Sequence, residues 1–170
     1  MTTVVRIAVV TVLIVVTVTL QMSIFSHFSI RGVVPDLALL LVIAAALVRG
    51  PSYAALVGFA AGLVLDLAPP ADHTAGRWAL SLVLVGYLAG LVRTDNETSV
   101  PGTLFIVASA AFVGTSVFAL TGLVLREPGI DVAAAFEVIP VAVGYDLLLA
   151  PLVIPVVLLL LRRLEPAKRW

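Results

Sequence analysis

About six long apolar runs fill nearly all of this 170-residue chain, and two of them carry a carboxylate. Asp66 stands at the end of one run, and Asp146 lies inside another. A charged side chain at membrane depth costs about 2.5–3.5 kcal/mol on insertion scales, so it faces protein or water rather than lipid. We therefore expect an integral membrane protein whose informative residues lie where its helices meet.

The composition excludes an ordinary soluble domain. Hydrophobic residues make up 62% of the chain and charged residues 12%, whereas soluble domains are about 45–50% apolar and about 25% charged. The length leaves room for a single membrane domain over residues 1–170. The chain has no cysteine, which excludes disulfides and thiolate chemistry. No basic tract with interleaved aromatic residues indicates nucleic-acid binding.

The apolar runs predict an all-α, polytopic membrane protein with about six transmembrane helices. Proline, glycine and charged residues separate the runs; Arg49-Gly50-Pro51, for example, ends one helix and begins the next. The first run is interpreted as an uncleaved span rather than a signal peptide, because residues 21–25 offer no small-x-small cleavage site. The expected spans are residues 5–24, 34–48, 51–67, 77–92, 101–125 and 138–161.

The basic residues predict that both ends of the chain lie in the cytoplasm (N-in, C-in). With this orientation, seven of the ten basic residues fall on the inner side, as the positive-inside rule requires. The inner residues are Arg6, Arg49, Arg93, Arg162, Arg163, Lys168 and Arg169, and the outer ones are Arg31, Arg77 and Arg126. Residues 161–170 are further predicted to act as a basic anchor at anionic headgroups.

Small residues recur at four-residue spacing on two neighbouring spans. Ala54, Gly58 and Gly62 form a stripe on the third span that Asp66 continues, and the fourth span carries a matching pair, Gly86 and Gly90. Small residues at this spacing let helix backbones approach closely. The stripe therefore predicts a close helix contact, either between two helices of this chain or with a partner protein.

Two intramembrane carboxylates stand near helix ends. Asp36 follows Pro35 at the start of the second span, where an acid complements the positive end of the helix dipole. It is interpreted as a helix cap or as a directly functional group. Asp66 either reaches headgroup water near Arg77 or His73, or makes a polar contact that fixes the third helix against a neighbour.

Asp146 follows Tyr145 about 12 Å into the expected sixth span, at 1.5 Å per residue. Three prolines share that helix and free main-chain carbonyl groups; they are Pro140, Pro151 and Pro155. Three interpretations of Asp146 stay open: a buried polar bond to Thr or Tyr, a ligand or ion cavity, and a partner contact. A cavity beside Asp146 would favour small-molecule binding, and tight packing would favour a scaffold.

The sequence offers little for catalysis. It contains two histidines, and Asp72-His73 in a loop is a weak metal signal. It has no phosphate-binding loop and no nucleophile elbow. We therefore predict no catalytic residues, no metal ligands and no cofactor.

The order of several short motifs resembles one known family. Pro35-Asp36 opens an apolar span, Arg49-Gly50-Pro51 makes a turn, residues 58–67 form a glycine-rich helix with Leu63-Val64-Leu65-Asp66 near its end, and residues 86–91 read Gly-Tyr-Leu-Ala-Gly-Leu. This order resembles the MreD family of rod shape-determining proteins. The loop after Leu67 departs from the glycine- and serine-rich loop expected there.

The resemblance implies a non-enzymatic membrane scaffold subunit of the cell-wall elongation machinery. Such a protein would sit in the inner (cytoplasmic) membrane, bind MreC and organise peptidoglycan synthesis. Its other neighbours would be RodA, a class B penicillin-binding protein, MreB and the lipid bilayer. The family's fold is also similar to the substrate-binding subunits of vitamin transporters. That likeness keeps a small-molecule-binding or transport subunit as the alternative, with Asp146 lining a cavity.

Overall fold

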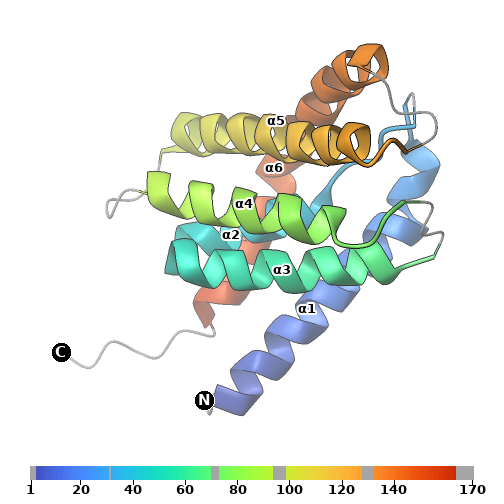
Figure 1. The fold of residues 1–170 in the computed structure, drawn as a ribbon. Helices are drawn as coiled ribbons and strands as arrows, with labels where there is room; N and C mark the ends of the chain where they lie inside the picture. Colours follow the sequence, from blue (N-terminus) through green and yellow to red (C-terminus); the bar gives the residue numbers. More distant parts are fainter. Residues whose placement is uncertain (1–2, 31, 70–72, 94–98, 128–131, 164–170) are drawn as a thin grey trace.

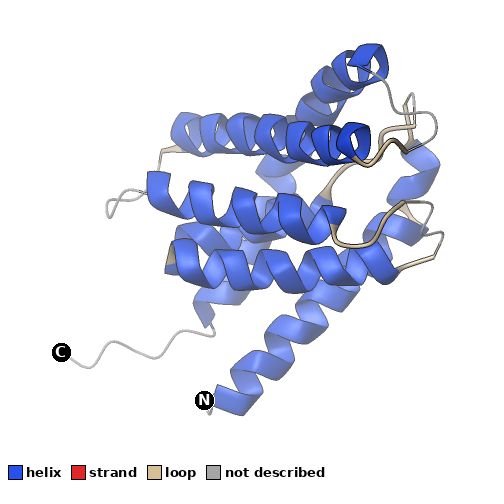
Figure 2. Cartoon of the chain, viewed as in Figure 1, coloured by secondary structure: helices blue, strands red, loops and turns tan. Residues whose placement is uncertain are grey.

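The computed structural model describes residues 3–30, 32–69, 73–93, 99–127 and 132–163. Within them the chain forms six α-helices and one short 3-10 helix, η1 (Figure 1). The helices are α1 Thr3–Ser23, η1 Phe25–Phe28, α2 Leu37–Arg49, α3 Pro51–Leu67, α4 Arg77–Val92, α5 Val100–Val124 and α6 Val132–Arg163. The described residues contain no strand (Figure 2), so the all-α prediction is confirmed.

The helices follow the predicted spans closely, with one larger difference. α6 begins at Val132, six residues before the expected start of the sixth span at 138. Glu137 lies in this added stretch of helix. Its side chain is exposed near the start of α6, so the helix can include it without burying a charge.

Three helices are long and three are short. α1, α5 and α6 have 21, 25 and 32 residues and are long and apolar enough to cross a membrane. α2, α3 and α4 have 13, 17 and 16 residues, or about 20–26 Å at 1.5 Å per residue. A hydrocarbon core is about 30 Å thick. Within such a core, the ends of a helix of this length would fall at depths where protein must satisfy its main-chain polar groups.

α2 is the centre of the molecule. Every residue from Leu37 to Ala46 is at most 5% exposed, and the helix packs against each of the other five α-helices. A helix that is apolar on all sides is a buried one. In Figure 1, α3, α4 and α5 lie side by side in front of α2, while α1 and α6 cross obliquely behind them.

Candidate functional site

Buried polar side chains gather at one end of the bundle. There the last turns of α1, α3 and α5 meet the first turns of α2 and α4, and the middle of α6. We call this the polar end and define it by Gln21, Asp36, Asp66, Arg77, Glu127 and Asp146. The opposite end carries Arg6, Arg49, Arg93, Arg162 and Arg163, and we call it the basic end.

The first turn of α2 lies inside the protein and receives three side-chain acceptors. The first N–H groups of any helix lack partners within the helix and need acceptors from elsewhere. Asp36 is the N-cap residue, and its Oδ1 accepts from the Leu39 N–H at 2.9 Å. Its own N–H donates to Oδ1 of Asp146 at 3.0 Å. The interpretation of Asp36 as a helix cap is thereby confirmed.

The remaining acceptor comes from α1. Oε1 of Gln21 accepts from the Ala38 N–H at 2.9 Å. Gln21, Asp36 and Asp146 are 4%, 8% and 1% exposed, so these bonds are shielded from water. Three helices, α1, α2 and α6, are thus joined at a single helix start.

The structure gives Asp146 a different partner from the side chains expected. Its carboxylate accepts from a main-chain N–H of another helix rather than from Thr or Tyr. The adjacent Tyr145 donates its hydroxyl to the Phe28 carbonyl of η1. Consecutive residues of α6 therefore hold both the start of α2 and the turn that follows α1.

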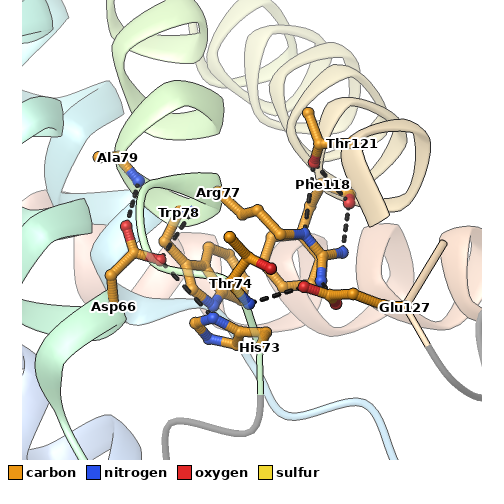
Figure 3. A network of polar contacts seen from close by, with 9 residues as sticks. All are labelled: Asp66, His73, Thr74, Arg77, Trp78, Ala79, Phe118, Thr121 and Glu127. Atoms are coloured by element: carbon orange, nitrogen blue, oxygen red, sulfur yellow. Dashed lines mark hydrogen bonds and ion pairs between the residues drawn. The ribbon is translucent and has the colours of Figure 1, made fainter. Parts of the chain in front are cut away.

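Asp66 does the same for α4. Its two oxygens accept from the N–H groups of Trp78 and Ala79, both at 3.1 Å (Figure 3). The residue is 2% exposed, so the interpretation that it reaches headgroup water was wrong. Asp66 instead fixes the end of α3 to the start of α4. Nδ1 of His73, which has no hydrogen-bond partner among the described residues, lies 3.8 Å from Asp66 Oδ1.

Arg77 ties the start of α4 to the end of α5. It pairs with Glu127, donates to the Phe118 carbonyl and lies 3.9 Å above the Phe118 ring (Figure 3). Its Nε reaches Thr121 Oγ1 at 3.4 Å. Arg77 is 3% exposed, and this set of acceptors and the ring face compensates its buried charge.

Glu127 is placed by the way α5 ends. Arg126 adopts a left-handed conformation with φ of 55°. The N–H of Arg126 then donates to Leu123 and that of Glu127 to Gly122, the bonding pattern of a Schellman C-cap. The Glu127 carboxylate accepts from the Thr74 N–H at 2.6 Å. That bond, together with Arg77, holds the pKa of Glu127 below its ordinary value.

The small-residue stripe of α3 lies against α4. A Cβ added to Gly58 would sit 2.3 Å from the Leu82 carbonyl oxygen, and one added to Gly62 would sit 2.4 Å from the Ala79 Cα. The contact is reciprocal: Cβ atoms on Gly86 and Gly90 would meet the main chain of Ala54 and Pro51 at 2.5 and 2.4 Å. The neighbour of the stripe in this structure is therefore internal.

Sequence reasoning missed Gln21, Ser81 and the pairing of Arg77 with Glu127. Ser81 is fully buried and donates to the Gly114 carbonyl of α5 at 2.7 Å. The available signal was a polar side chain within an apolar run, which indicates that a partner exists. It does not identify the partner.

A cavity of about 490 Å³ opens beside the polar end. Its wall includes Gln21, Asp36, His73, Trp78 and Asp146, among mostly apolar side chains. Among the described residues, no group of three or more His, Asp or Glu is placed to hold a metal ion. The cavity could accept a small, largely apolar molecule with hydrogen-bonding groups near the carboxylates.

The comparison with family models gives one match. The model for the rod shape-determining protein MreD matches residues 1–164, essentially the whole chain. No curated protein and no solved structure gave a significant match. The helical bundle and its three membrane-length helices agree with that family's character as membrane proteins. The chain therefore belongs to the MreD family of rod shape-determining membrane proteins.

Proposed function

We propose that the chain is a non-enzymatic scaffold of the cell-wall elongation machinery, which binds MreC and organises peptidoglycan synthesis. The observation that carries this proposal is how the buried carboxylates are used. Asp36, Asp66 and Asp146 all accept hydrogen bonds from the first N–H groups of α2 and α4. Such groups fix the positions of helices, which is the requirement for a rigid docking platform.

The MreC surface is proposed on the groove between α5 and α6. α4 covers the stripe of α3, so that stripe leaves no face for a partner helix. The α5–α6 groove measures about 440 Å³, and Phe112 and Phe136 on its wall are 55% and 73% exposed. A membrane span of MreC with small residues on one face would fit there by van der Waals packing.

Co-purification tests this surface. Ala119→Trp places a large side chain in the groove, whereas Ala8→Trp places the same side chain on an exposed position of α1. We expect Ala119→Trp to keep normal membrane abundance and lose MreC in mild detergent, with Ala8→Trp retaining both. MreC retained at wild-type level by Ala119→Trp would reject this groove as the interface.

The same machinery would place RodA, a class B penicillin-binding protein and MreB near the chain in the inner membrane. In a rod that grows by lateral insertion, clean deletion should round the cells and delocalise wall synthesis. Normal shape after deletion would contradict the scaffold role.

A multi-pass arrangement with both ends in the cytoplasm completes the proposal. The basic end carries five arginines, consistent with the cytoplasmic face. Reporter fusions after Asp95 and at Trp170 should both read cytoplasmic; both positions lie outside the described residues, as does most of the expected basic anchor. A periplasmic reading at Trp170 would reject this topology.

The cavity at the polar end favours a second candidate, a small-molecule-binding or transport subunit. Ala142 lines the cavity and is half-buried, so Ala142→Trp would fill it without replacing a carboxylate. The scaffold proposal expects normal cell shape and normal MreC binding in this variant. Loss of uptake of a labelled vitamin, with shape unchanged, would support the second candidate instead.

A further inference from the structure

The fully buried side chains of α1 all lie in its second half. Its buried residues are Ile14, Thr17, Val18 and Gln21, and its described residues before Ile14 are half-buried or exposed. Before Ile14, α1 lies near α3 without packing tightly against it, and a groove of about 290 Å³ remains between the two helices. The groove therefore exists because the contact between the two helices is incomplete at the basic end.

The groove is charged at one end and apolar at the other. Arg6 from α1 and Arg49 from the last turn of α2 line it near the basic end. The Arg49 guanidinium lies 4.7 Å above the Tyr53 ring, which keeps it at the groove. Ile14 and Ala60 line the other end, about 10–12 Å further along the helices at 1.5 Å per residue.

We propose that this groove binds one anionic phospholipid, with its phosphate between Arg6 and Arg49 and an acyl chain along the apolar wall. Guanidinium groups match phosphate oxygens in charge and in hydrogen-bond geometry. Basic pockets between membrane helices on the cytoplasmic side bind acidic headgroups. A fully soluble anion fits the groove less well than a lipid, because it would leave the apolar wall beyond the arginines uncovered.

Native mass spectrometry of the delipidated full chain in mild detergent tests the proposal. The probes are phosphatidylglycerol and phosphatidylcholine, added to the micelles at equal concentration. We expect one phosphatidylglycerol to be retained about tenfold more strongly than phosphatidylcholine. In the double variant Arg6→Gln, Arg49→Gln, that preference should disappear. The matched control Arg163→Gln removes an exposed charge at the same end outside the groove and should keep it.

A second variant guards against misfolding of the first. Ala60→Trp fills the apolar end of the groove and leaves both arginines in place. It should reduce retention of both lipids. Equal retention of the two lipids by the wild-type chain, or unchanged retention in both variants, would overturn the proposal. So would a photo-crosslinker at Leu56 that captures MreC instead of lipid in the membrane.

Discussion

The α3–α4 contact and the buried start of α2 both hold helices together, but by different physics. Between α3 and α4, glycines remove side chains, and the two main chains come into direct contact. At the start of α2, side chains from α1 and α6 accept hydrogen bonds from main-chain N–H groups. One region is stabilised by dispersion across a close approach and the other by satisfying polar groups that lipid cannot satisfy.

The difference concerns tolerance. The close contact between α3 and α4 is lost when any side-chain atom is added to its glycines, whatever the chemistry of that atom. The helix start fails only when an acceptor is lost, so a neutral acceptor of similar shape should serve. If the carboxylates at the starts of α2 and α4 are structural, substitutions that keep every acceptor will destabilise the protein little. Substitutions that add volume between α3 and α4 will destabilise it strongly.

The largest effect should follow Gly58→Ala. The new Cβ would lie 2.3 Å from the Leu82 carbonyl oxygen, so α3 and α4 must separate along their length. Overpacking costs about 1–3 kcal/mol and sometimes more, and a main-chain clash belongs at the upper limit. We expect low membrane abundance and a lower thermal unfolding midpoint in detergent. Gly144→Ala is the matched control, because nothing lies within 4 Å of a Cβ added there. Equal stability of the two variants would mean that α3 and α4 are further apart than described.

Asp66→Asn should cause the next largest loss of stability. It sharpens the comparison of the two regions because Asp66 continues the small-residue stripe of α3 and also caps the start of α4. Both carboxylate oxygens accept N–H groups, from Trp78 and Ala79. An asparagine has one acceptor oxygen, so one buried N–H loses its partner at a cost of about 1–3 kcal/mol. Thermal unfolding in detergent measures this loss. A wild-type midpoint for Asp66→Asn would show that one of the two bonds is not made.

The smallest effect should come from Glu127, at the rim of the polar end. Its pKa is lowered in the folded protein, first by the Thr74 N–H and also by Arg77. Its contribution to stability is therefore complete above the ordinary carboxyl pKa of about 4.3 and is lost as the pH falls through the lowered value. The unfolding midpoint of the wild type should fall more steeply below about pH 4.3 than that of Glu127→Gln. If the unfolding midpoints of the wild type and Glu127→Gln changed with pH in parallel, Glu127 would not contribute to the contacts that hold α4 to α5.

The sequence predicted the local features of this fold and missed the distant pairings. The four-residue spacing of Gly58 and Gly62 indicated a close contact, and Pro35-Asp36 indicated a helix cap, because each depends on residues within a turn or two. Gln21 lies 17 residues from Ala38, and Asp146 lies 110 residues from Asp36. No local pattern identifies such partners, because the path of the whole chain decides which polar groups meet.

The same reason explains the correction at Asp66. A carboxylate followed by a proline-containing loop suggested access to water. α4 instead begins beside the end of α3, and the N–H groups of its first turn take the place of water. Whether a polar group at a helix end is hydrated or hydrogen-bonded to protein depends on where the next helix begins.

The most direct test of the structural account compares Asp146→Asn with Asp146→Leu. Asparagine keeps an oxygen for the Asp36 N–H, whereas leucine leaves that buried donor without a partner, at about 1–3 kcal/mol. Membrane abundance and cell shape should be close to wild type for Asp146→Asn, and abundance should be low for Asp146→Leu. Normal abundance of Asp146→Asn together with loss of rod shape would contradict the account, because the charge or proton of Asp146 would then be needed for function itself.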